Sequence, residues 1–222
     1  MRPRLIIFDV NETLSDMSSL QQRFADVGMP STGAGTWFAG LLRDGFALTV
    51  TGANPAFADL AAESLRGLLG DRDEEQVEDD VQHVMSGFTS LAVHPDVVQG
   101  VRALRALDVR LVTLSNGASS VAEDLLERAG ITDCFTDLLS VSEAPAWKPA
   151  QSAYEHALRC CAVEPAEAML VAVHPWDIHG AHEAGLQTGW INRDRRRYPG
   201  FFSQPDVTAT SVVDLARKLA AS

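Results

Sequence analysis

The chain is poor in the residues that build disulfide frameworks and zinc sites. It has three cysteines among 222 residues, namely Cys134, Cys160 and Cys161. The number is odd and the adjacent pair lacks the spacing of metal ligands, so the sequence indicates neither kind of site. A reduced compartment fits this pattern best, and we expect a cytoplasmic protein.

Positive charge is also scarce. Lysine and arginine total 18 against 30 aspartates and glutamates, which gives a formal net charge of -12 and a pI near 4.8. Long-range repulsion from such a surface opposes encounters with nucleic acids and with anionic membranes. We therefore expect neither a nucleic-acid partner nor a membrane partner.

Long apolar runs are absent too. The first run, RLIIFDV at residues 4–10, stops at Asp9 and is too short for a secretory signal, and no later run could span a bilayer. Hydrophobic residues nevertheless make up 46% of the chain, which is enough for a buried core. The length suits one α/β core with a modest insertion.

The order of apolar patterns predicts the fold. Residues 4–10 are typical of a strand buried on both faces, whereas residues 16–90 show only helical spacing. After His94 the pattern alternates between strands and helices, which is the signature of a doubly wound parallel sheet. We predict an α/β fold with a Rossmann-like core of residues 1–15 and 91–222 and a helical insertion at 16–90. The expected helices are 17–28, 35–50, 55–69, 74–88, 96–107, 118–129, 150–161, 178–184 and 211–220, and the later strands are 109–114, 137–141, 168–173 and 187–191.

Polar residues gather where these strands end. Asp9 follows the first strand, Ser115-Asn116-Gly117 follows the second, Lys148 precedes a helix, and Asp177 comes shortly after the strand at 168–173. In parallel sheets such ends meet at one edge. A lysine beside a buried carboxylate keeps it ionised and nucleophilic, and a Ser-Asn pair can bind an anionic group. An isolated aspartate at a strand end is usually a cap or turn residue, so the companion motifs carry the functional interpretation.

The ordered motifs DxxxT, SNG, KP and WD resemble those of the haloacid dehalogenase superfamily. The resemblance is closest to the L-2-haloacid dehalogenase branch and covers nearly the whole chain, including LLSV, KPAQSAYEHAL, WDIHGAHEAG and GWINR. The helical insertion matches the cap of that branch. The resemblance also implies a homodimer.

The resemblance implies roles for individual residues. Asp9 is expected to displace a leaving group and form an aspartyl ester, with Thr13, Ser115 and Lys148 holding it in place. Asp177 is expected to assist hydrolysis of that ester. The residues expected to line the substrate site are Asn11, Phe38, Asn116, Tyr154 and His174.

Two positions distinguish the branches of the family. The phosphatases need a second aspartate two residues after the nucleophile, to protonate a leaving alkoxide, and this chain has Asn11 there. They also hold magnesium with a carboxylate at the position of Ala172. Its loss favours metal-independent chemistry without a cofactor, although Asp9 and Asp177 could still bind magnesium weakly. Halide needs no proton to leave, so both losses favour carbon–halogen cleavage.

Other positions depart from the dehalogenases. Phe38 follows Trp37 where they have an arginine, and Arg43 lies five residues further on, on a different helical face. His174 replaces an asparagine, and it either helps to activate the hydrolytic water or is a structural loop residue. Glu12 replaces a glycine and is either an added acid or base, or a solvated residue paired with a nearby cation. The run 193–197 is expected to be a solvated loop.

The leading hypothesis is a hydrolase that dehalogenates a small 2-halo acid. One alternative is a magnesium-dependent phosphohydrolase acting on a small phosphoester. Another is a binding protein that keeps the fold and has lost turnover.

Overall fold

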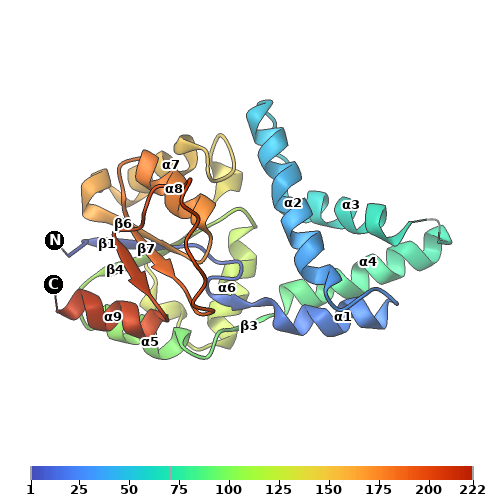
Figure 1. Ribbon diagram of the computed structural model, residues 1–222, viewed down its shortest axis with the longest axis horizontal. Helices are drawn as coiled ribbons and strands as arrows, with labels where there is room; N and C mark the ends of the chain where they lie inside the picture. The colour runs from blue at the N-terminus through green and yellow to red at the C-terminus, as the bar shows by residue number, and fades with distance from the viewer. Residues whose placement is uncertain (1, 71, 222) are drawn as a thin grey trace.

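A computed structural model describes residues 2–70 and 72–221, which form an α/β core and a helical cap (Figure 1). Within these residues the core holds a parallel sheet with the strand order β5-β4-β1-β6-β7-β8. The strands are β1 (Leu5–Phe8), β4 (Arg110–Ser115), β5 (Asp137–Ser140), β6 (Ala168–Ala172), β7 (Gln187–Ile191) and β8 (Val207–Ala209). Strand β1 therefore lies in the middle, between β4 and β6.

The apolar sequence of β1 serves both faces of the sheet. Leu5 and Ile7 pack with one hydrophobic cluster, and Ile6 and Phe8 pack with the other, because successive side chains of a strand point to opposite faces. One face is covered by α5 (Val97–Arg105), α6 (Ser119–Arg128) and α9 (Val212–Ala220), and the other by α7 (Gln151–Cys161) and α8 (Pro175–Glu183). Short 3₁₀ turns lie at η1 (Met17–Ser19), η2 (Thr132–Cys134), η3 (Val141–Glu143) and η4 (Pro165–Glu167).

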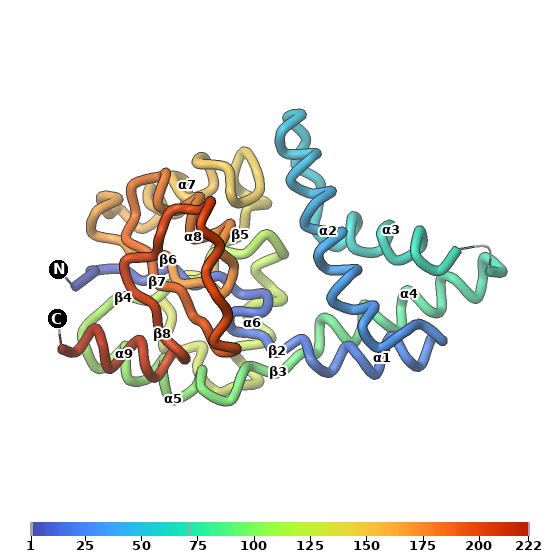
Figure 2. Tube along the Cα trace, in the orientation of Figure 1, coloured from blue at the N-terminus to red at the C-terminus, as the bar shows by residue number. Residues whose placement is uncertain are grey.

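The cap stands beyond one edge of the core (Figure 2). It consists of α1 (Leu20–Asp26), α2 (Gly33–Val50), α3 (Phe57–Leu69) and α4 (Glu74–Thr89). The chain leaves the core through β2 (Ser15–Asp16) and returns through β3 (Ala92–Val93), which pair as an antiparallel ladder. Trp37 is buried inside the cap, where its ring lies 5.9 Å from that of Phe88 and its indole N–H donates to the carbonyl of Ala61.

The predicted doubly wound α/β class is confirmed, and three local predictions need correction. The helix expected from residue 178 begins at Pro175, because proline suits the first position of a helix. The segment 17–28 is a 3₁₀ turn followed by a shorter helix. β8 and the β2–β3 pair were not predicted. No helix of the described segments combines the length and apolarity needed to cross a bilayer.

Candidate active site

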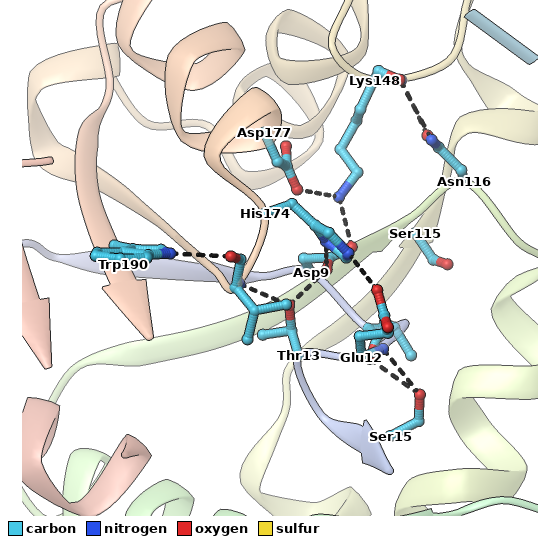
Figure 3. A network of polar contacts seen from close by, with 12 residues as sticks. Asp9, Glu12, Thr13, Ser15, Ser115, Asn116, Lys148, His174, Asp177 and Trp190 are labelled. Atoms are coloured by element: carbon cyan, nitrogen blue, oxygen red, sulfur yellow. Dashed lines mark hydrogen bonds and ion pairs between the residues drawn. The ribbon is translucent and has the colours of Figure 1, made fainter. Parts of the chain in front are cut away.

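The carboxyl ends of β1, β4 and β6 bring the predicted polar residues to one edge of the sheet (Figure 3). Asp9 follows β1 directly, and its backbone N–H donates to the carbonyl of Val171 in β6. Ser115 is the last residue of β4. The structure therefore places Asp9 beside both neighbouring strands, as expected for a parallel sheet.

Lys148 bridges the two carboxylates of the site. Its ammonium Nζ lies 2.9 Å from Oδ1 of Asp9 and 2.7 Å from Oδ2 of Asp177. The side chains of Lys148 and Asp177 are fully buried. Burial lowers the pKa of Lys148, but the charges of Asp177 and Asp9 outweigh it, so the net pKa lies above the ordinary lysine value. The lysine is therefore a buried cation at neutral pH.

The other oxygen of Asp9 receives two donors. The Thr13 hydroxyl donates to Oδ2 at 2.5 Å, and Nδ1 of His174 lies 3.2 Å from the same oxygen. Thr13 also accepts the backbone N–H of Val173, which joins the loop after β1 to the end of β6. Burial raises the pKa of Asp9, but Lys148, His174 and Thr13 together hold it well below the ordinary aspartate value. Asp9 is therefore an ionised carboxylate.

Asp177 lies in the first turn of α8, and each of its two carboxylate oxygens accepts a hydrogen bond from a side chain. Tyr154 of α7 donates its hydroxyl to Oδ1 of Asp177 at 2.6 Å, opposite the bond from Lys148. The close approach of the two helices depends on Gly180, where an added Cβ would lie 2.6 Å from the Tyr154 hydroxyl. Burial raises the pKa of Asp177 and Lys148 opposes this, with a net pKa above the ordinary value. A raised pKa makes Asp177 a better proton acceptor than Asp9.

Ser115 and Asn116 occupy different positions in the site. Both ends of the Asn116 amide are bonded to the backbone of Lys148, at 2.9 and 3.2 Å, so this side chain positions the lysine. Ser115 Oγ accepts the backbone N–H of Gly117 at 2.9 Å. In residues 2–70 and 72–221 no acceptor is found for the Ser115 hydroxyl proton, which leaves this donor for a ligand.

Glu12 and His174 contact each other. From the sequence they were expected as two independent departures from the dehalogenase pattern. Nε2 of His174 lies 2.8 Å from Oε2 of Glu12, while Nδ1 contacts Asp9 (Figure 3). Burial lowers the pKa of His174, but the contacts with Asp9 and Glu12 outweigh it and raise the pKa to about 9. The imidazole is therefore charged at neutral pH, and Glu12 is paired with a cation, which was one of the two sequence-based alternatives.

Phe38 and Arg43 do not supply the cation found in the dehalogenases. Phe38 is buried, and its ring centroid lies 6.4 Å from that of His174. Arg43 is exposed and pairs with its neighbour Asp44 at 2.8 Å. The imidazolium of His174 thus lies beside the Phe38 ring.

Residues 194–197 are exposed, as expected for a solvated loop, whereas Arg193 departs from that expectation. Its Nε donates to Asp96 at 3.0 Å, and its Nη2 donates to the backbone carbonyl of Thr13 at 3.0 Å. Asp96 in turn accepts the backbone N–H of Val212 at the start of α9. Arg193 therefore secures the loop that carries Asp9, a role hidden within a run of charged residues.

A small cavity and a large cavity lie beside the loop after β1. The smaller, of about 50 Å³, has mainly apolar walls and lies beside Asn11 and Ser115, with Phe57, Met85 and Phe88 of the cap opposite. The larger, of about 680 Å³, is reached by Glu12 and His174 and is bordered by polar residues of the cap and of the loop after β7. The small cavity thus lies at Asn11 and Ser115, and the large one lies at Glu12 and His174.

The carboxylates at this edge of the sheet are paired with cations of the protein itself. The ammonium of Lys148 contacts both Asp9 and Asp177, and the side chain of Ala172 offers no ligand. Across the described segments no group of three or more His, Cys, Asp or Glu side chains has the arrangement of a metal site. Magnesium prefers several hard oxygen ligands in a near-octahedral arrangement, which these residues do not provide.

Comparisons with known proteins agree with this geometry. The chain is 25% identical to (S)-2-haloacid dehalogenase 2 of Pseudomonas sp. (strain CBS-3), over 97% of this chain and 95% of that enzyme. It is 34% identical to haloacetate dehalogenase H-2 of Moraxella sp. (strain B), over 54% of each protein, so this match spans about half the length of that relative. The solved L-2-haloacid dehalogenase of Xanthobacter autotrophicus shares the fold, with a TM-score of 0.86 at 23% identity over 98% of each chain. The family model of haloacid dehalogenase-like hydrolases matches residues 3–185, and the chain belongs to this family.

Proposed function

We propose that this protein is a metal-independent hydrolase that removes halide from a small 2-halo acid through an ester on Asp9. The observation that carries the proposal is the buried, ionised Asp9 carboxylate held by Lys148, next in the chain to Val10 and Asn11, which line a small apolar cavity. A positioned carboxylate of this kind can attack carbon and divide one difficult displacement into two easier steps.

In the first step an oxygen of Asp9 attacks the carbon that carries the halogen. The carbon–halogen bond breaks and halide leaves with the bonding electron pair, so an ester forms between Asp9 and the substrate. Halide needs no proton to leave, which fits the amide of Asn11 at a position where an acid would serve an alkoxide.

In the second step water attacks the carboxyl carbon of the Asp9 ester. Asp177 takes one proton from that water and passes it to the oxygen of the departing 2-hydroxy acid. The second proton of the water is left on the restored Asp9 carboxyl group, which loses it because its pKa is low. The overall reaction consumes one water and releases one hydroxy acid, one halide and one proton.

The volume of the smaller cavity supports a small substrate. One water needs about 10–15 Å³ of such space, so about 50 Å³ accommodates only a few heavy atoms. Its apolar wall suits a short alkyl group, and the free Ser115 hydroxyl suits a carboxylate. The names of the relatives, which act on (S)-2-halo acids and haloacetate, support the same size and chemistry.

The test compares chloride release from 2-chloropropionate with phosphate release from a phosphoester panel, each with magnesium and with a chelator. We expect chloride release that survives the chelator and is lost in Asp9→Asn. Asp124→Asn, which changes an exposed carboxylate on α6, is the matched control and retains activity. Magnesium-dependent phosphate release that disappears in Asp9→Asn, without chloride release by the wild type, contradicts the proposal.

An isotope experiment tests the ester directly. One turnover in H₂¹⁸O with excess enzyme should place the label in the peptide that contains Asp9, because the product takes its oxygen from the carboxylate. Label found only in the hydroxy acid would mean direct attack of water on the substrate.

We also propose that the enzyme acts in the cytoplasm, without a cofactor, as a homodimer. Free cysteines at positions 134, 160 and 161 support a reduced compartment. Size-exclusion chromatography with light scattering measures the oligomeric state, and a monomeric mass at micromolar concentration contradicts the dimer.

A further inference from the structure

The two oxygens of Asp9 differ in how many donors they receive. Each carboxylate oxygen has about two acceptor sites. Oδ2 has both filled, by the Thr13 hydroxyl at 2.5 Å and by the imidazole of His174 at 3.2 Å. Oδ1 receives only the ammonium of Lys148, at 2.9 Å. Within the described residues Oδ1 is therefore the oxygen with a free electron pair.

This asymmetry assigns different chemical fates to the two oxygens. Oδ1 attacks the substrate carbon and becomes the bridging oxygen of the ester. Oδ2 then becomes the carbonyl oxygen. When water adds to the carboxyl carbon, the electron pair of that carbonyl bond moves to Oδ2, so negative charge develops on the atom that already faces Thr13 and His174.

We propose, on the basis of the function proposed above, that His174 and Thr13 form the oxyanion site for hydrolysis of the Asp9 ester. His174 is then a catalytic residue, because its N–H touches the atom on which charge develops. Glu12 is a positioning residue that acts through His174. When the intermediate collapses, the bond from the carboxyl carbon to Oδ1 breaks, the electron pair on Oδ2 re-forms the carbonyl, and the alkoxide takes the proton held by Asp177.

The surroundings of His174 support this role. Nε2 lies 2.8 Å from Glu12, and because the imidazole is charged both ring nitrogens carry a proton, so Nε2 donates to Glu12 while Nδ1 donates to Asp9. The imidazole is stacked on Trp176, with ring centroids 5.1 Å apart and an interplanar angle of 26°, and it tilts against Phe38. Its side chain is only 12% exposed. Donors fixed in advance and shielded from water stabilise developing charge more than mobile solvent does.

The cationic contact of His174 with Oδ2 has opposite effects on the barriers of ester formation and ester hydrolysis. In the first step Asp9 loses negative charge as the ester forms, so a cation at Oδ2 stabilises the starting carboxylate more than the transition state. In the second step charge develops at Oδ2, so the cation stabilises the transition state more than the ester. Only the second effect accelerates a step. Loss of the imidazole should therefore slow ester hydrolysis while ester formation is unchanged or faster.

The experiment measures both steps by rapid quench, with the Asp9 ester quantified by mass spectrometry after mixing with 2-chloropropionate. In His174→Phe, which keeps an aromatic ring between Trp176 and Phe38, we expect ester hydrolysis to fall about 10²–10³-fold, the usual effect of removing one oxyanion donor. The ester should then accumulate. His182→Phe changes an exposed histidine of α8, the helix that follows His174, and should leave both rates unchanged.

Further variants keep the test decisive. His174→Gln retains an N–H donor without the charge and should recover part of the hydrolysis rate, and it replaces His174→Phe if that variant does not fold. Glu12→Gln should slow hydrolysis less than His174→Phe does, again without slowing ester formation. The inference is overturned if these His174 variants hydrolyse the ester at the wild-type rate, or slow both steps equally. If no ester forms in wild type or in Asp177→Asn, the proposed function itself fails.

Discussion

The protonation of His174 makes stability depend on pH in a defined direction. In the folded protein its pKa is raised from 6.5 to about 9, since the contacts with Asp9 and Glu12 outweigh burial. A group whose pKa is raised by folding stabilises the folded state fully below its unfolded pKa, and this contribution is lost as the pH rises through the folded pKa. The contribution is therefore complete below pH 6.5 and disappears above pH 9.

The magnitude follows from the same two values. Each pH unit between them corresponds to about 1.4 kcal/mol, so His174 stabilises the folded protein by about 3 kcal/mol at pH 6. About half of this remains near pH 8, midway between the two pKa values. Asp9 stays ionised over this range because its pKa lies well below it, and it adds no slope of its own.

The assay is urea unfolding of wild type and His174→Gln at intervals from pH 6 to pH 10. The free energy of unfolding of the wild type minus that of the variant should fall by about 3 kcal/mol over this range. In Glu12→Gln the contact of His174 with Asp9 remains, so the free energy of unfolding of this variant should keep part of the wild-type pH dependence. His182→Gln changes an exposed position and should keep all of that pH dependence. A flat difference curve for His174→Gln would refute the assignment of a charged imidazole between two carboxylates.

Three further substitutions test the packing of the site and of the cap. Lys148→Met removes the cation between two buried carboxylates and should lower the free energy of unfolding by about 3–5 kcal/mol at pH 7, with a smaller loss at pH 5 as the carboxylates take up protons. Gly45→Ala places a Cβ 2.3 Å from the ring of Trp147 and should destabilise by about 1–3 kcal/mol. Gly35→Ala in the same helix meets no atom within 4 Å and should instead stabilise by about 0.5–1 kcal/mol in the same urea titration, and equal effects of the two changes contradict the packing argument.

The regular elements were predictable where local pattern and tertiary packing agree. The helix expected at 150–161 is α7 (Gln151–Cys161), and the strand expected at 109–114 is β4 (Arg110–Ser115). β8 (Val207–Ala209) was missed, because three residues with an exposed middle position carry no periodic signal. Its pairing is set by β7 beside it, which is a tertiary effect.

The candidate site was predictable as a set of motifs and not as a network of contacts. The parallel sheet brings Asp9, Ser115 and Asp177 to one edge, so their proximity follows from topology. The contact between Glu12 and His174 joins residues 162 positions apart, and no local pattern indicates it. The hydrogen bonds of Asn116 to the Lys148 backbone could not be predicted either. An SNG motif predicts a turn, but it does not indicate which residue the asparagine side chain contacts.

The three departures from the dehalogenase pattern belong to one cluster of contacts. Glu12 has a φ of 60°, a left-handed conformation that suits glycine and costs about 1–2 kcal/mol for other residues. Its carboxylate pairs with His174, whose ring lies against Phe38, the residue at the position of the missing arginine. If the substitutions at positions 12, 38 and 174 were unrelated to one another, we would expect an unpaired charge or a packing gap at each of these positions. Here the cation absent at position 38 is matched by an imidazolium that contacts Asp9 itself, which favours a rebuilt catalytic site over a fold retained only for binding.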